Sequence, residues 1–79
     1  MKITVKLIAT YRQHLPEGTV GNSCILDVPE GHTVKDVLEK FDIPMDKSTV
    51  VLVNGHVPEY ERVLLEDDVV AAFSAIAGG

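Results

Sequence analysis

The fold of this chain is decided by the stretch Thr33-Val34-Lys35-Asp36-Val37-Leu38-Glu39-Lys40-Phe41. Its apolar positions follow the i, i+3, i+4, i+7 spacing that places side chains on one face of an α-helix. They are Val34, Val37, Leu38 and Phe41. Polar and charged residues fill the remaining positions, so the stretch predicts an amphipathic helix with one apolar stripe.

Both ends of this predicted helix carry sequence signals. Thr33 is a suitable N-cap, and Asp36 three residues later forms a capping box, with aspartate where glutamate or glutamine is usual. Pro44 disfavours helical conformation in the residue before it. We therefore expect the helix to end at Asp42 or Ile43, after about two and a half turns.

Five other segments have the character of β-strands, and they are residues 3–9, 23–28, Thr49–Val53, 56–60 and 69–76. The first alternates apolar and polar residues with the period of two that is typical of a half-buried strand. Asn54-Gly55 is the strongest short-range signal for a hairpin turn. Pro58 lies in the return segment and restricts it to a short edge strand.

Two connections have little regular pattern. Residues 11–22 are polar and contain a proline and two glycines, which predicts a loop. Residues 61–68 are acidic and irregular, and we expect Val63, Leu64 and Leu65 to anchor a turn against the core.

A helix with one apolar stripe must bury that stripe on one face of a sheet. The predicted fold class is therefore α+β, with a mixed sheet of four to five strands and one main helix packed across it. We treat residues 1–79 as a single domain in which residues 74–79 form a flexible C-terminal tail ending in Gly-Gly.

Composition excludes several classes of function. The net charge of −5 argues against nucleic-acid binding, which needs clustered lysine and arginine, and against docking on an anionic membrane. The first residues lack the apolar core of a signal peptide, and no apolar run reaches the length of a transmembrane helix. We therefore expect a cytoplasmic protein.

No candidate catalytic or metal site emerges from the titratable residues. His14, His32 and His56 are scattered among loops without the convergent spacing that a zinc site needs, and we interpret them as surface histidines. Cys24 cannot form an intrachain disulfide, because it is the only cysteine, and its strand position favours a buried structural thiol over a nucleophile.

An acidic run at residues 66–68 has two interpretations, a divalent-cation site and a solvated turn, and the turn is favoured because charge runs are commonly solvated. No phosphate-binding or dinucleotide-binding motif occurs. We therefore predict a protein that is not an enzyme, with no bound metal or cofactor.

The remaining feature is the C-terminal sequence Phe73-Ser74-Ala75-Ile76-Ala77-Gly78-Gly79, an expected strand that runs into two glycines. Glycine has no Cβ, so it enters a narrow cleft in extended or left-handed conformations and leaves its carbonyl open to attack from either side. The bland alternative is a frayed terminus. We expect the carboxylate of Gly79 to be the reactive group of the molecule.

Over its whole length the chain resembles the MoaD/ThiS family of ubiquitin-like sulfur carriers. The segments that carry the resemblance are Leu7-Ile8-Ala9-Thr10-Tyr11-Arg12, residues 28–38, Val53-Asn54-Gly55, residues 64–70 and residues 73–79. Two positions depart from the family pattern, with Asp67 where glycine is usual and Ser74-Ala75 where the molybdopterin branch has a Pro-Pro pair.

The resemblance implies a β-grasp fold, in which the first and last strands lie parallel in the middle of the sheet. It also implies that a ubiquitin-activating-type adenylyltransferase uses ATP to adenylate Gly79, after which a sulfur donor enzyme replaces AMP to give a thiocarboxylate. Gly78 and Ala77 would be needed to thread the tail into a partner. Phe73 and Ile76 are the expected docking surface, with core packing as the alternative for Phe73.

By the same resemblance, the sulfur passes to the large subunit of molybdopterin synthase or to a thiazole synthase of thiamine biosynthesis. Chain length and the Ala9/Arg12 pattern favour the molybdopterin type. Two alternatives remain, a protein modifier conjugated through Gly79 and a non-catalytic β-grasp interaction module. We expect the free protein to be a monomer.

Overall fold

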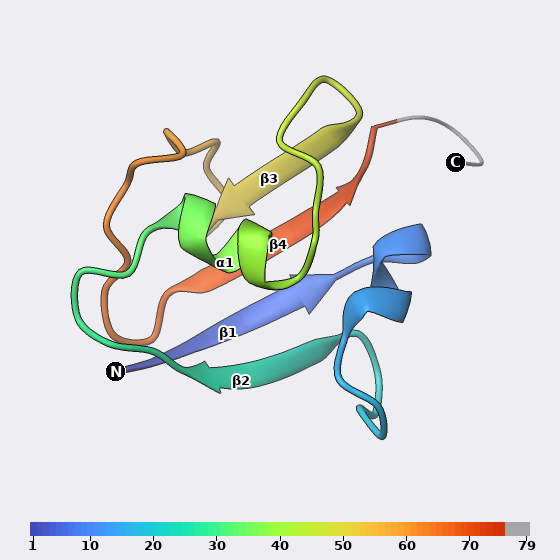
Figure 1. The fold of residues 1–79 in the computed structure, drawn as a ribbon, viewed down its shortest axis with the longest axis horizontal. Helices are drawn as coiled ribbons and strands as arrows, with labels where there is room; N and C mark the ends of the chain where they lie inside the picture. The colour runs from blue at the N-terminus through green and yellow to red at the C-terminus, as the bar shows by residue number, and fades with distance from the viewer. Residues whose placement is uncertain (76–79) are drawn as a thin grey trace.

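A mixed β-sheet with a helix across one face makes up residues 1–75, the part of the chain that this computed structural model describes (Figure 1). The elements are β1 (Lys2–Leu7), the 3-10 helix η1 (Ala9–His14), β2 (Ser23–Asp27), α1 (Val34–Lys40), β3 (Thr49–Val53) and β4 (Val69–Ser74). The strand order is β2-β1-β4-β3; the central pair β1 and β4 is parallel, and both outer strands are antiparallel to their neighbours. The predicted α+β fold with parallel first and last strands is confirmed.

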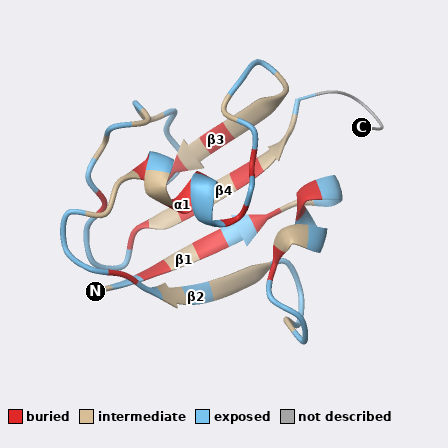
Figure 2. Cartoon of the chain, in the orientation of Figure 1, coloured by how far each residue is buried: buried red, intermediate tan, exposed pale blue. Residues whose placement is uncertain are grey.

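The core lies between α1 and one face of the sheet (Figure 2). Side chains alternate between the two faces of each strand, so Ile3, Val5 and Leu7 of β1 and Val70 and Ala72 of β4 are buried on the helix side. The four apolar residues of the predicted helical stripe are all buried, which confirms the predicted helix register.

The N-terminus of α1 is fully hydrogen-bonded in its first turn. Thr33 Oγ1 accepts from the Asp36 N–H at 3.2 Å, and Asp36 Oδ2 accepts from the Thr33 N–H at 3.0 Å, so the predicted capping box is confirmed. The next two N–H groups, of Val34 and Lys35, donate to carbonyl groups in residues 60–62 at 3.0 and 2.9 Å. This segment therefore satisfies donors that a helix end leaves free.

The C-terminus of α1 differs from the prediction. The helix ends at Lys40, because Asp42 has a left-handed backbone with φ of 58°. The Ile43 N–H donates to the Leu38 carbonyl at 2.9 Å and the Asp42 N–H to the Glu39 carbonyl at 3.2 Å. These two bonds form a Schellman motif, so the expected end at Asp42 or Ile43 was too late.

The first strand is also shorter than the predicted segment 3–9. It ends at Leu7 because Ala9 has φ of 55°, a left-handed conformation that no strand contains. The chain then forms η1, which takes the place of the end of the predicted strand and the start of the predicted loop. An alanine at positive φ carries steric strain, so surrounding contacts hold this corner.

The predicted fifth strand, 56–60, does not form. Asn54 and Gly55 both have positive φ, 51° and 87°, which confirms a tight turn of the predicted hairpin kind. Val53 and His56 exchange two hydrogen bonds, but the pairing stops there as an isolated bridge. Pro58 lacks an N–H group and cannot extend the ladder. The sheet of the described residues therefore has four strands.

Residues 61–68 only partly match the expected anchor. Leu64 is buried, whereas Val63 and Leu65 are 50% and 63% exposed. Leu64 is fixed by its N–H, which donates to the His32 carbonyl at 2.8 Å. The expectation that all three residues pack against the core was wrong for two of them.

No helix in residues 1–75 is long and apolar enough to cross a membrane.

Candidate functional site

The base of the C-terminal tail is held by the loop before β3. The Ala75 N–H donates to the Ser48 carbonyl at 2.8 Å, directly after β4 ends at Ser74. Asp46 Oδ1 accepts from the Ser48 N–H at 2.8 Å and from the Ser48 hydroxyl at 2.5 Å. Both bonds lower the pKa of Asp46, and the bond from the Ser48 hydroxyl has the larger effect. The ionised carboxylate therefore orients the carbonyl that holds the tail base.

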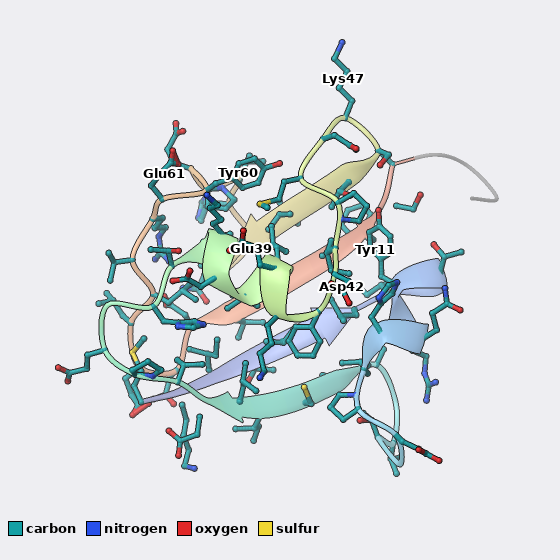
Figure 3. All side chains as sticks on the ribbon, in the orientation of Figure 1. Tyr11, Glu39, Asp42, Lys47, Tyr60 and Glu61 are labelled. Atoms are coloured by element: carbon teal, nitrogen blue, oxygen red, sulfur yellow. The ribbon has the colours of Figure 1, made fainter. Side chains whose placement is uncertain are left out.

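The helix η1 supports the same end of the sheet (Figure 3). The Ile8 N–H donates to the Ala72 carbonyl at 3.1 Å, which joins the start of this helix to β4. Tyr11 is buried, and its hydroxyl is 2.7 Å from Thr49 Oγ1 in β3. Hydrogen bonds that join η1 to β4 and to β3 thus fix the point from which the tail leaves the domain. Lys47 projects from the neighbouring loop away from the body of the molecule.

Four of the predicted site residues, Ile76, Ala77, Gly78 and Gly79, lie outside the described residues. Their predicted roles in docking, threading and activation, and the predicted flexibility of the tail, remain predictions. Covalent geometry limits the reach of these four residues to about 14 Å beyond Ala75. A partner must therefore bring its reactive group close to the end of β4.

Phe73 is the predicted docking residue that the structure describes. It alternates with the buried Val70 and Ala72 along β4, so it lies on the open face of the sheet, opposite α1. It is half-buried and pairs with Val50 of β3 in the antiparallel register. Together with Leu52, Ala71 and Val50, it forms an apolar surface that we call the open-face patch.

The acidic run at residues 66–68 only partly matches the solvated turn that we expected, because Glu66 and Asp67 are exposed in a turn but Asp68 is not. Asp68 is buried, with its side chain only 8% exposed, and its Oδ2 accepts from the Leu65 N–H at 2.8 Å and from Arg62 at 3.0 Å. Its Oδ1 accepts from Asn54 Nδ2 at 2.8 Å. The Asn54 side chain also accepts from the Val69 N–H at 2.9 Å. Asp68 therefore ties the hairpin turn to the start of β4.

Burial alone would raise the pKa of Asp68. The hydrogen bonds from Leu65, Asn54 and Arg62, with the charge of Arg62, outweigh that effect and lower the pKa. A lowered folded-state pKa stabilises the fold above the pKa of an unfolded aspartate, about 3.9, and this stabilisation is lost as the pH falls through the folded-state pKa.

We predict that Asp68→Asn lowers the free energy of unfolding at pH 7 by about 1–3 kcal/mol, because buried donors lose their charged acceptor. The difference from the parent should begin to shrink as the pH falls below about 3.9, the pKa of an unfolded aspartate, and should be lost as the pH falls through the lowered folded-state pKa of Asp68. Urea denaturation of both proteins across this pH range measures the difference. A pH-independent difference would contradict the assigned role of the Asp68 charge.

The histidines and the cysteine occupy separate places. His14 packs edge-on against Tyr11, with ring centroids 6.0 Å apart. His32 is largely buried rather than on the surface as expected; its Nδ1 lies 3.9 Å from Asp36, and its buried Nε2 has no hydrogen-bond partner among residues 1–75. Cys24 is partly buried on the helix side, and this burial raises its thiol pKa.

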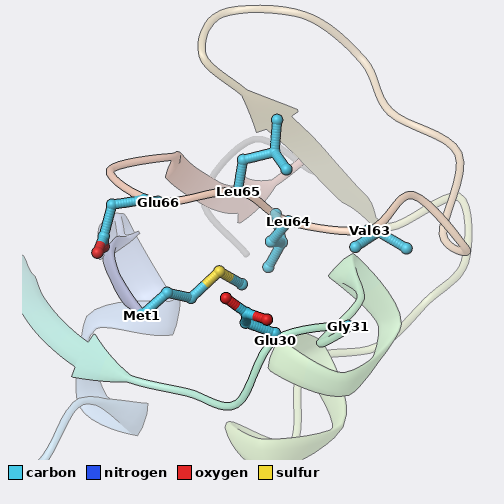
Figure 4. A pocket seen from close by; sticks show the side chains of 7 residues that line it. All are labelled: Met1, Glu30, Gly31, Val63, Leu64, Leu65 and Glu66. Atoms are coloured by element: carbon cyan, nitrogen blue, oxygen red, sulfur yellow. The ribbon is translucent and has the colours of Figure 1, made fainter.

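No three histidine, cysteine, aspartate or glutamate residues in the described chain are grouped so that they could hold a metal ion. A hollow of about 530 Å³ lies at the end of the sheet where β1 and β4 begin (Figure 4). Its lining residues are Met1, Glu30, Gly31, Val63, Leu64, Leu65 and Glu66. Because β1 and β4 are parallel, the tail leaves from the opposite end of the sheet.

The strand order and the helix across one face of the sheet define a ubiquitin-like β-grasp protein. A model of the ThiS family matches residues 5–79, and the chain belongs to this family. No curated protein matches the chain in sequence.

Several solved structures share the fold, among them the following three. SAMP1 from Haloferax volcanii superposes with a TM-score of 0.77 at 22% identity, over 100% of both chains. A second structure of H. volcanii small archaeal modifier protein 1 has a TM-score of 0.75 at 20% identity, over 95% of this chain and 98% of that one. A Pyrococcus furiosus protein described as molybdopterin converting factor, subunit 1, has a TM-score of 0.75 at 25% identity, over 95% and 98% of the two chains.

Proposed function

We propose that this chain is a sulfur carrier whose Gly79 carboxylate is adenylated and converted to a thiocarboxylate. The observation that carries the proposal is the Gly-Gly sequence that follows the central strand β4 by four residues in a chain of the ThiS family. The bonds among Ala75, Ser48 and Asp46 support it, because they hold the tail base at one end of the domain.

The proposed chemistry needs two enzymatic steps. A carboxylate is ionised at neutral pH and is a poor electrophile. An oxygen of the Gly79 carboxylate attacks the α-phosphorus of ATP, pyrophosphate leaves, and an acyl adenylate forms. Hydrosulfide supplied by the donor enzyme then attacks the carbonyl carbon, AMP leaves with the oxygen that it received from the carboxylate, and loss of the proton gives the thiocarboxylate. The product carries one sulfur atom in place of one oxygen atom.

In this proposal the domain itself is a carrier and binds no cofactor, since ATP is used by the activating enzyme. Proteins of this family are small carriers that work with partner enzymes. The short reach beyond Ala75, about 14 Å, means that a partner must also contact the body of the domain. The open-face patch around Phe73, with Ile76, is the proposed docking surface for the adenylyltransferase, because it continues along β4 towards the tail.

The proposed partners are a ubiquitin-activating-type adenylyltransferase, a sulfur donor enzyme, and a synthase that consumes the sulfur. The large subunit of molybdopterin synthase is favoured as the synthase by the likeness to the P. furiosus molybdopterin converting factor. A thiazole synthase is the other candidate, since the matching model is that of the ThiS family. A cytoplasmic location, with access to ATP and these enzymes, is part of the proposal.

Protein modification through Gly79 is the second candidate function. Two H. volcanii structures that share the fold are those of a small archaeal modifier protein. A modifier would use the same acyl adenylate, but a lysine amine of a target protein would replace AMP. The two functions therefore share the activation step and differ in the nucleophile.

Incubation with the adenylyltransferase of the same organism, ATP and a sulfur donor tests the proposal. Intact mass spectrometry of a carrier should show a gain equal to the difference between sulfur and oxygen, and the gain should need ATP and the donor. Covalent adducts on other proteins in a lysate, without this gain, would indicate a modifier. If neither product forms, both candidate functions are contradicted.

The docking surface is tested in the same assay. Phe73→Ser should raise the carrier concentration needed for half-maximal loading, because it removes an apolar contact from the open-face patch. Val20→Ser is the matched control, since Val20 is 93% exposed and lies in the loop before β2. Equal loading of the two variants would place the docking surface elsewhere, provided that circular dichroism shows both to be folded.

A further inference from the structure

The outer edge of β2 is open. The Leu7 N–H donates to the Asn22 carbonyl at 2.9 Å, and the Val28 N–H donates to the Met1 carbonyl at 2.8 Å. In and around β2, the even-numbered residues from 22 to 28 therefore form their backbone hydrogen bonds with β1. The alternate residues Ser23, Ile25 and Asp27 must then direct their backbone N–H and C=O groups away from β1. Within residues 1–75 these six groups have no hydrogen-bond partner.

The other edge of the sheet is hydrogen-bonded to its own chain near both of its ends. In β3, the Thr49 N–H donates to the Asp46 carbonyl at 3.1 Å, and Val53 exchanges two bonds with His56 at 2.7 and 3.0 Å. Val57, Pro58 and Tyr60 line a hollow beside the first half of this strand. Within residues 1–75 the backbone N–H and C=O groups of Val51 have no hydrogen-bond partner, so only the middle of this edge is open. Natural proteins usually protect edges with proline, lysine, bulges or covering segments.

The strand β2 has none of these protections. Its pairing with β1 is continuous from Ser23 to Asp27, without a bulge, and the strand contains no proline or lysine. Ile25 at its centre is 71% exposed. An unprotected edge with an exposed β-branched residue at its centre is a template for another strand.

We propose that β2 pairs antiparallel with β2 of a second copy of this chain, about a twofold axis at Ile25. In this register Ile25 lies opposite its own counterpart, Ser23 lies opposite Asp27, and Cys24 lies opposite Leu26. The backbone N–H and C=O groups of Ser23, Ile25 and Asp27 in one copy bond to those of Asp27, Ile25 and Ser23 in the other. The resulting sheet runs continuously through both copies, with the two β2 strands at its centre.

The side chains of β2 fit this self-pairing. Opposed Ile25 side chains remove exposed apolar surface from water, and a serine hydroxyl can donate to the carboxylate of Asp27 opposite it. No two like charges lie directly opposite one another, an arrangement that would be destabilising. A shift of two residues would centre the pairing on Cys24 and place Ile25 opposite Ser23, so the paired isoleucines would be lost.

The proposed dimer leaves the tail accessible. β1 separates β2 from β4, so the end of β4 that carries the tail base is not at the new interface. The interface is small and each copy carries a charge of −5, so the association is weak. This inference is independent of the proposed sulfur-carrier function, and it departs from the monomer expected from the sequence.

Sedimentation equilibrium of the untagged chain under reducing conditions tests the pairing, from about 10 μM to about 1 mM. The average mass of the parent should rise towards that of a dimer. Ser23→Asp places carboxylates opposite each other at both ends of the pairing and should weaken association about tenfold or more. The swapped variant S23D/D27S restores one carboxylate and one hydroxyl in each pair and should regain association.

Val57→Asp is the matched control, because it adds the same charge at an 80% exposed residue on the far side of the sheet. It should associate like the parent. Ile25→Pro, which removes the central outward N–H, should remain monomeric while circular dichroism shows a folded domain. A parent that stays monomeric at the highest concentration, equal effects of S23D and V57D, or a swap that does not restore association would each overturn the proposal.

Discussion

Deleting Gly79 is expected to abolish loading with sulfur while leaving the domain folded. The deletion moves the terminal carboxyl group back by about 3.5 Å. A misplacement of a reacting group by only 1 Å in an active site can lower the reaction rate about 100-fold. The buried core of the described chain runs from Ile3 to Ala72, so the deletion removes none of it. Adding one residue after Gly79 should have the same effect, since it also displaces the reactive carbonyl.

The readout is intact mass after incubation with the adenylyltransferase, ATP and the sulfur donor. Val20→Ser leaves the tail unchanged and serves as the control, which should still load. If the deletion variant loaded at the parent rate, the terminal carboxylate would not be the reactive group. Loss of the folded circular dichroism spectrum on deletion would instead show that the tail has a structural role.

Replacing Leu38 with alanine is expected to lower the free energy of unfolding by about 2–5 kcal/mol. Leu38 lies on the buried face of α1 and is 1% exposed, so the truncation leaves a cavity between the helix and the sheet. A loss of this size is a large part of the stability of a small domain. Urea denaturation followed by circular dichroism measures it.

Glu39→Ala is the matched control for this substitution. Glu39 is the next residue on the helix and is exposed, and surface changes of this kind usually stay within about 0.5 kcal/mol. Equal stability of the two variants would mean that α1 presents a different face to the sheet.

The parts of the fold that could be predicted from the sequence depend on local signals. The helical stripe and the capping box of Thr33 and Asp36 are confirmed because both depend on residues within two turns of each other. The turn at Asn54-Gly55 is confirmed for the same reason. The parallel pairing of β1 and β4 followed only from the family resemblance, because periodicity carries no information on strand direction.

The errors arose where backbone conformation contradicts residue type or where distant segments meet. Ala9 ends the first strand with a positive φ that alanine ordinarily avoids, so its identity gave no warning. Asp67, by contrast, has φ of 69° at a position where the resemblance indicated glycine, so its left-handed turn was foreseeable.

Part of the site surroundings could not be predicted. The burial of Asp68 depends on Asn54 and Arg62, which come from separate segments and meet only in the folded chain. The contact of Ala75 with Ser48 depends on the pairing of β3 with β4 in the same way. The Gly-Gly sequence is visible in the sequence alone, but the central position of the strand that precedes it is known only from the folded chain.

Fragmentation mass spectrometry of the loaded chain tests the central claim most directly. After incubation with the adenylyltransferase, ATP and the sulfur donor, we predict that the mass gain of sulfur for oxygen appears only in fragments that contain Gly79. A gain located on Cys24 or on any fragment without Gly79, or the absence of any gain, would contradict the assignment of Gly79 as the sulfur-carrying residue.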